Sequence, residues 1–171
     1  MDKILARVPE YARPPRLFAR ETGWRTRAEV VTLRWADVDL DQELVTPPPE
    51  RSKNGEARTI GFTDELRGIF AHLAALRPDH ARSDPVFSFP DGRALSGDHL
   101  YRLWQEATIE AGLPGKILHD LRRTAVRSLI RAGVDERRTM DVTGHKARRL
   151  RPLQHHVAAR PPRGCPATRP D

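Results

Sequence analysis

The chain has 171 residues, enough for one domain with a hydrophobic core, and its 38% hydrophobic and 31% charged residues are typical of a soluble globular protein. No apolar run approaches the roughly 20 residues needed to cross a bilayer, and the N-terminus has no secretory segment, so we expect a cytoplasmic protein without membrane contact. The single cysteine, Cys165, excludes an internal disulfide and a cysteine-based zinc site.

The net charge of +7 is compatible with a nucleic-acid partner, but it is unevenly distributed. Residues 147–171 carry six arginines and one aspartate, whereas residues 1–146 carry 24 basic and 22 acidic side chains. Bulk charge is therefore weak evidence for DNA binding, and particular residues have to carry that interpretation.

The hydrophobic pattern predicts a mainly helical α+β domain over residues 1–146. Helices are expected over Val8–Arg20, Arg27–Leu33, from an N-cap at Thr63 to the residue before Pro78, from an N-cap at Ser96 to Gly112, over His119–Ala132 and over Asp135–Val142. Short strands are expected at Glu43–Val45, Ala57–Ile60 and Val86–Phe89. The first two strands should form an antiparallel hairpin through Ser52–Gly55, because Asn-Gly is a strong turn signal.

The last 25 residues differ in composition from the rest. Residues 147–171 hold five of the fifteen prolines, six arginines and the cysteine, without hydrophobic periodicity. Such a segment cannot bury enough surface to offset its ordering entropy, so we expect a disordered tail.

Four short segments carry residues suited to chemistry. Each alone has an ordinary explanation, such as a helix start, a surface lysine, a capping pair or a helix C-cap. The segments are Thr22–Arg25 followed by Glu29, Ser52–Gly55, His119–Thr124 and Thr143–Lys146.

The order of these segments resembles the catalytic domain of the tyrosine recombinases, the phage integrase family. That family shows an arginine, a hairpin lysine, His-x-x-Arg and Gly-His in this order, which corresponds here to Arg25, Lys53, His119, Arg122 and His145. The flanking segments 33–39 and 111–113 match as well, and the resemblance covers about residues 8–148. It implies the mainly helical tyrosine-recombinase fold with a small antiparallel sheet.

The resemblance implies site-specific DNA breakage and rejoining through a 3′-phosphotyrosyl intermediate. Arg25 and Arg122 would each donate paired hydrogen bonds to the non-bridging phosphate oxygens, and His145 would add a further donor. Lys53 suits a general acid for the leaving 5′ oxygen, and His119 is placed to exchange a proton with the attacking phenol. The arginines supply the positive charge, so we expect no metal and no small-molecule cofactor.

Further residues support this set. Glu29 would orient Arg25, although it lies four residues after Arg25 rather than the more usual three. Double-stranded DNA is the expected partner, and a homo-oligomer on the DNA is one option. The expected DNA contacts are Arg25, Lys53, Arg122, Arg123 and Lys146.

The nucleophilic tyrosine of the family is missing. Its expected position, nine residues after His145, holds Gln154. The two tyrosines of the chain are poor substitutes, because Tyr11 precedes the first arginine and Tyr101 has apolar neighbours that suggest packing. The chain as written is therefore predicted not to cut DNA.

A frameshift is our hypothesis for the missing tyrosine. Residues 149–157 can be encoded so that dropping one base yields Val-Phe-Asp-Arg-Tyr-Asn-Ile-Thr, which is similar to the family's tyrosine motif. The protein sequence does not fix the codons, so it is compatible with a frameshift near residues 147–149 without establishing one. The family also carries an N-terminal DNA clamp, which we expect to be absent because Met1 lies close to the catalytic domain.

Three interpretations stay open. The first is an inactive, frameshifted integrase remnant from a phage or transposon. The second is an active recombinase whose tyrosine is restored by programmed frameshifting or whose sequence contains an error. The third is a non-enzymatic DNA-binding protein that occupies recombination sites and modulates intact partners.

Overall fold

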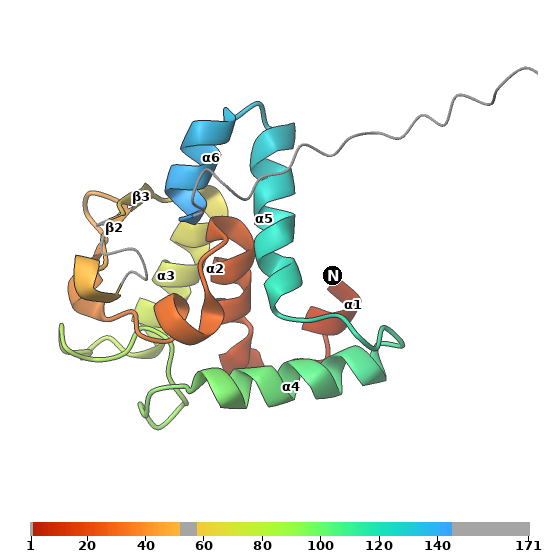
Figure 1. Ribbon diagram of the computed structural model, residues 1–171. Coiled ribbons are helices and arrows are strands. Elements are labelled where there is room, and N and C mark those ends of the chain that lie inside the picture. Colours follow the sequence, from red (N-terminus) through yellow and green to blue (C-terminus); the bar gives the residue numbers. More distant parts are fainter. Residues whose placement is uncertain (1, 52–57, 145–171) are drawn as a thin grey trace, which may run out of the picture.

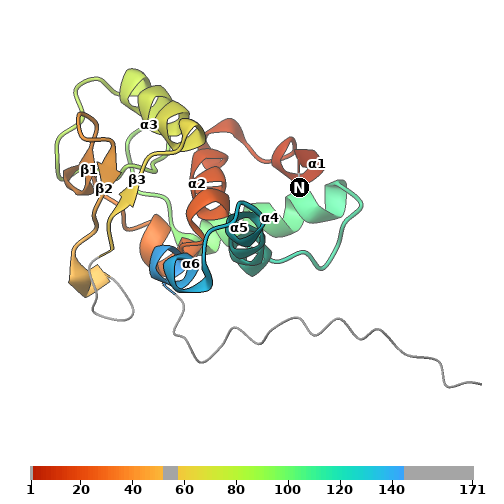
Figure 2. The ribbon, with the colours of Figure 1, turned by 90° about the horizontal axis from the view of Figure 1, so that it is seen from above.

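A computed structural model describes residues 2–51 and 58–144. Helix α2 (Pro14–Thr22) lies at the centre, with α3 (Asp64–Leu76) on one side and α5 (His119–Arg131) on the other (Figure 2). Helix α6 (Glu136–Thr143) packs beside α5, and α4 (Gly97–Glu110) crosses beneath them (Figure 1). The predicted mainly helical α+β fold is confirmed.

The remaining elements are short. They are α1 (Asp2–Leu5), the 3-10 helices η1 (Glu10–Ala12), η3 (Trp35–Asp37) and η4 (Pro49–Arg51), the π-helical turn η2 (Thr26–Val30), and the strands β1 (Val38–Asp39), β2 (Leu44–Val45) and β3 (Ile60–Gly61).

Three helices begin at side-chain caps, as the sequence predicts. The Thr63 hydroxyl accepts from the Leu66 N–H at 3.2 Å, and the Ser96 hydroxyl accepts from the His99 N–H at 3.1 Å. The Asp135 carboxylate caps α6 by accepting from the Arg138 N–H at 3.0 Å. Each such cap contributes about 1 kcal/mol, which explains why local sequence locates these helix starts well.

The first predicted helix, Val8–Arg20, is wrong in its start. The helix begins at Pro14, and the preceding residues form α1 and η1 instead. Pro14 and Pro15 occupy its first two positions, where a missing backbone N–H costs nothing because the first turn has no intrahelical acceptor. The prolines therefore start the helix rather than interrupt it.

The second predicted helix, Arg27–Leu33, is replaced by the π-helical turn η2. The Arg25 carbonyl accepts from the Glu29 N–H at 2.8 Å and from the Val30 N–H at 3.1 Å. A π-helical turn accommodates one residue more than an α-helical turn. The wider turn affects where Glu29, four residues after Arg25, lies relative to Arg25.

The sheet has three antiparallel strands in the order β1-β2-β3. Val45 of β2 pairs with Val38 of β1 and with Ile60 of β3, so β1 is a strand that the sequence analysis did not predict. The predicted strand at Val86–Phe89 is wrong, because only an isolated bridge between Ser88 and Ala94 forms there. The chain reverses directly after Phe89, where the Gly92 N–H donates to the Phe89 carbonyl at 2.9 Å.

An aromatic cluster holds the centre of the fold. Phe18 of α2 is fully buried and contacts Trp24 edge-on at 5.4 Å, Phe70 at 5.9 Å and Phe87 at 5.6 Å between ring centroids. Aromatic pairs at these distances add packing energy beyond the buried area. The cluster fixes Trp24, and with it the loop that follows α2.

None of the helices in the described part of the chain has the length and apolar character that a membrane span requires.

Candidate functional site

Three of the predicted site residues, Arg25, Glu29 and Arg122, lie at the loop that follows α2. Gly23 adopts the left-handed conformation with a φ of 69°, and its amide closes α2 on the Ala19 carbonyl. A Cβ at this position would lie 2.9 Å from Thr143 Cγ2 and 3.2 Å from Ala125 Cβ. Glycine therefore allows the end of α2 to approach both α5 and α6 closely.

Arg122 reaches this loop from the first turn of α5. The residue is 4% exposed, and its Nη1 donates to the Gly23 carbonyl at 2.6 Å. Burial lowers the pKa of Arg122 to about 10, with the nearby cations Arg25 and Arg58 acting in the same direction and Glu29 opposing them. The guanidinium stays charged at neutral pH, so a positive charge is held inside the fold.

Arg25 and Glu29 form an ion pair across the π-helical turn. Arg25 Nη1 donates to Glu29 Oε1 at 3.0 Å, and the Arg25 backbone N–H donates to Glu29 Oε2 at 2.8 Å. The Glu29 side chain is 3% exposed and the Arg25 side chain 32% exposed. The π-helical turn thus brings the carboxylate back onto Arg25 despite the four-residue spacing, while part of the guanidinium faces solvent.

Arg58 belongs to the same cluster, and the sequence analysis missed it. Its Nη2 donates to Glu29 Oε1 at 2.6 Å, and its side chain is 9% exposed. The guanidinium carbon lies 5.0 Å from the centre of the Trp24 ring, a cation–π distance. In the sequence, Arg58 is an ordinary charged residue of a predicted strand. Only its contact with the buried Glu29 in the structure identifies Arg58 as part of the cluster.

Trp24 ties this loop to the end of α6. Its indole Nε1–H donates to the Val142 carbonyl at 3.0 Å. Helix α6 then ends at Gly144, which is left-handed with a φ of 65° and whose amide bonds to the Met140 carbonyl. The Gly-His motif predicted from the sequence therefore starts beside Trp24 and Arg58.

His119 and Arg123 lie on the first turn of α5, at its surface. Partial burial lowers the pKa of His119, and the positive charges of Arg122, Arg123 and Arg25 lower it further. The ring is therefore neutral at pH 7 and able to accept a proton. Arg123 is exposed and pairs with Asp120 at 3.4 Å.

Of the predicted site residues, the structure brings together Arg25, Glu29 and Arg122, with His119 close enough to be affected by both arginines. Lys53, His145 and Lys146 lie outside the described residues, as do Gln154 and the predicted tail 147–171. Their roles stay predictions. Within the described ranges, no group of three or more His, Cys, Asp or Glu side chains could hold a metal ion.

The two tyrosines lie elsewhere in the fold. The Tyr11 hydroxyl is hydrogen-bonded to His99 Nε2 at 3.0 Å. Tyr101 is 41% exposed, and the Arg27 guanidinium lies 5.7 Å from its ring centre. The expectation that Tyr101 packs inside is therefore wrong, because it lies on the outer face of α4.

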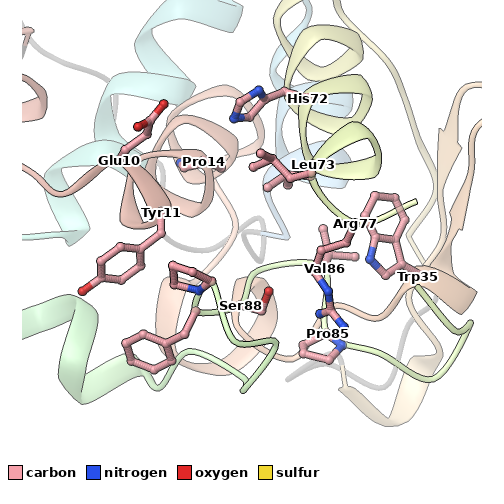
Figure 3. Close-up of a pocket in the computed structure, with 13 residues that line it drawn as sticks. Glu10, Tyr11, Pro14, Trp35, His72, Leu73, Arg77, Pro85, Val86 and Ser88 are labelled. Atoms are coloured by element: carbon pink, nitrogen blue, oxygen red, sulfur yellow. The ribbon is translucent and has the colours of Figure 1, made fainter. Parts of the chain in front are cut away.

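A cavity of about 550 Å³ opens on another part of the molecule. Figure 3 shows Tyr11 and Pro14 on one side of it and Trp35, Arg77 and Pro85 on the other. None of the predicted site residues that the structure describes lines this cavity. The arginine cluster and the cavity are therefore separate features.

The chain matches the family described as the phage integrase family over residues 8–151. Among curated proteins, the integrase of Salmonella phage P22 is 27% identical over 130 residues, which cover 68% of this chain and 32% of that integrase. The chain thus spans about a third of the length of this relative.

Solved structures share the fold. A lambda integrase (75–356) dimer bound to a COC′ core site superposes with a TM-score of 0.68 at 19% identity, covering 85% of this chain and 55% of that one. XerA recombinase gives a TM-score of 0.63 at 22% identity, covering 86% and 56%. The Tn1549 transposon integrase in complex with circular intermediate DNA gives 0.65 at 15% identity, covering 85% and 55%.

Proposed function

Because the chain belongs to the phage integrase family, we propose that Arg25 and Arg122 bind one backbone phosphate of double-stranded DNA at a site of strand exchange. The chain as written binds this phosphate without cutting the DNA. The observation that carries the proposal is the cluster of three guanidinium groups around Glu29: Arg25 and Arg58 donate to its carboxylate, and Arg122 is close enough for Glu29 to affect its pKa.

The charges of this cluster suit a phosphodiester. Arg25, Arg58 and Arg122 together with Glu29 carry an excess of two positive charges. A phosphodiester carries one negative charge, and the pentacoordinate transition state of its attack carries two. Preorganised donors of this kind stabilise such a transition state by about 3–4 kcal/mol each in a water-poor site.

The proton transfers fall to other residues. The neutral ring of His119, whose pKa is lowered by partial burial and by the neighbouring arginines, is suited to accept a proton from an attacking hydroxyl. We assign the protonation of the leaving 5′ oxygen to Lys53 and a further hydrogen bond to His145. Arg123 and Lys146 are proposed to contact flanking phosphates.

The nucleophile is what this chain does not supply. Gln154 stands at the tyrosine position, and an amide cannot form the phosphotyrosyl intermediate. Under this proposal, residues 1–146 form the DNA-binding catalytic domain, and residues 147–171 form an out-of-frame tail. The protein acts in the cytoplasm, where it reaches DNA, and it assembles there with further copies on the duplex.

Two other functions follow from the same cluster. A restored tyrosine, by programmed frameshifting or by correction of the sequence, makes the chain an active recombinase. Without the tyrosine, a chain that still binds phosphate occupies recombination sites and modulates recombinases that have an intact tyrosine. Sequencing the gene across the codons for Gly144 to Val157 separates the first possibility from the second.

DNA binding tests the proposal. Fluorescence anisotropy with duplex DNA over a salt series should give an affinity that falls steeply with salt, as phosphate contacts require. R25A and R122A should each bind at least about 10-fold more weakly, because a hydrogen bond to a charged group contributes about 1.5–3 kcal/mol. R93A is the matched control, since Arg93 is an exposed arginine paired with Asp91 outside the cluster.

Equal affinities of R25A, R122A and R93A would contradict the phosphate site. A covalent protein–DNA adduct formed by the chain as written would contradict the absence of cleavage. Denaturing electrophoresis of protein incubated with labelled duplex detects such an adduct, and Q154Y is the variant in which it becomes possible.

A further inference from the structure

We propose that Arg58 is a positioning residue of the phosphate site, which offsets the charge of Glu29 and thereby leaves Arg25 available to the DNA. The inference rests on the function proposed above. It adds a residue that the recognised motif, from Arg25 to His145, does not contain.

The carboxylate of Glu29 accepts hydrogen bonds from two arginines, Arg25 and Arg58. Oε1 accepts from Arg58 at 2.6 Å and from Arg25 Nη1 at 3.0 Å, while Oε2 accepts from the Arg25 backbone N–H at 2.8 Å. A carboxylate that is 3% exposed requires a counter-ion, because water cannot solvate it. With Arg58 in place, that counter-charge does not have to come from Arg25 alone.

The exposures of the two arginines separate their tasks. The Arg58 side chain is 9% exposed and enclosed, whereas the Arg25 side chain is 32% exposed and can reach a ligand. Arg58 acts through Glu29, and Arg25 meets the phosphate. Without the Arg58 charge, Glu29 would neutralise Arg25, and the excess over the whole cluster of Arg58, Arg25, Arg122 and Glu29 would fall from two positive charges to one.

The position of Arg58 is defined from three sides. Trp24 offers its ring face at 5.0 Å, and Glu29 accepts from one guanidinium nitrogen. Gly144 has a φ of 65°, which favours glycine, and a Cβ there would displace the Arg58 guanidinium at Nη1. Arg58 thus connects the loop after α2 to the turn that ends α6.

The charges around Glu29 indicate an anion site. Arg25, Arg58 and Arg122 together with Glu29 carry an excess of two positive charges. This excess is suited to binding an anion beside the partly exposed Arg25.

The test measures whether DNA affinity follows the charge at position 58. R58M and R58Q remove the charge, and R58Q keeps a hydrogen-bond donor for Glu29, while R58K keeps the charge. We expect R58M and R58Q to bind a labelled DNA duplex about tenfold more weakly in low salt, and R58K to stay within about threefold of wild type. R67M is the charge-matched control, because Arg67 is an exposed arginine of α3 that pairs with Glu43 and Asp64.

A double-mutant cycle tests whether Arg58 affects DNA affinity through Glu29. In an E29Q background, the loss from R58M should shrink to about twofold, because no carboxylate remains to neutralise Arg25. Thermal melts by circular dichroism establish that each variant is folded, and R58Q carries the test where R58M does not fold. A tenfold loss that persists in E29Q, or an affinity that is restored in R58Q, overturns the positioning role.

R25A separates this inference from the proposed function. If R25A binds as wild type does, Arg25 holds no phosphate, and both proposals fall. If R25A binds weakly while R58M and R67M bind equally well, only the role of Arg58 is overturned.

Discussion

Two arginines in this molecule are buried, and burial lowers the pKa of both, but their surroundings differ. Arg16 in α2 is fully buried, Arg122 in α5 is 4% exposed, and burial lowers the pKa of each to about 10. Arg16 donates to the carbonyls of Ala12 and Leu100 and lies against the Trp104 ring, so it joins α2 to α4. Arg122 instead lies near two further arginines.

The difference lies in how each charge is compensated. Arg16 is held by backbone carbonyl groups and an aromatic face, which are neutral partners that fix the packing of two helices. Around Glu29 the arginines outnumber the carboxylate, and Arg25 remains partly exposed. Burial of an arginine therefore does not by itself indicate a ligand site in this fold, and our proposal of a phosphate site depends instead on the excess of arginines around Glu29.

The largest expected effect is on Arg16. R16A should lower the free energy of unfolding by about 3 kcal/mol, because it leaves a cavity and removes the donor to the Leu100 carbonyl. Urea unfolding measures this loss, and DNA affinity of the folded protein should change by less than about twofold. A variant of normal stability that binds DNA weakly would break the distinction between the two arginines.

A smaller effect is expected at Gly23, which supports Arg122. G23A should cost about 2 kcal/mol, from the left-handed φ of 69° and from the displacement of Thr143 and Ala125. Gly112 is the matched control, since it has a φ of 68° and no neighbour within 4 Å of a Cβ, so G112A should cost only about 1 kcal/mol. Equal losses in urea unfolding would mean that the approach of α2 to α5 and α6 is not tight.

The smallest effect concerns His119 and pH. Because its pKa is lowered in the folded protein, the unfolded chain binds a proton more readily, so this contribution to stability is complete above the ordinary pKa of 6.5 and is lost as the pH falls below it. Wild type should therefore lose more stability than H119Q between pH 7.5 and the acidic range, by a small amount because the ring is exposed. Chemical unfolding of both proteins at several pH values measures the difference; parallel profiles would mean that the arginine charges do not reach the ring.

The local parts of the fold are predictable from sequence. Helices α3, α4 and α6 have Thr63, Ser96 and Asp135 as N-caps. These side chains accept from backbone amides three residues ahead and need no tertiary partner. The start of α2 is harder to predict, because a proline such as Pro14 can either interrupt a helix or begin one, depending on its position. Strand β1 was missed because two residues carry too little pattern for the alternation of a strand.

The sequence by itself determined the order of the motif residues Arg25, Lys53, His119, Arg122 and His145 and the presence of Gln154 at the expected tyrosine position. It also predicted helices α3 to α6, because these depend on residue order and local spacing. Only the tertiary structure decided that Glu29 serves two arginines and that Arg58 is one of them. It also decided that Arg16 is held by packing contacts while Arg122 lies in a charged cluster. The reason is physical: compensation of a buried charge depends on distances across elements remote in sequence, such as the 29 residues between Glu29 and Arg58.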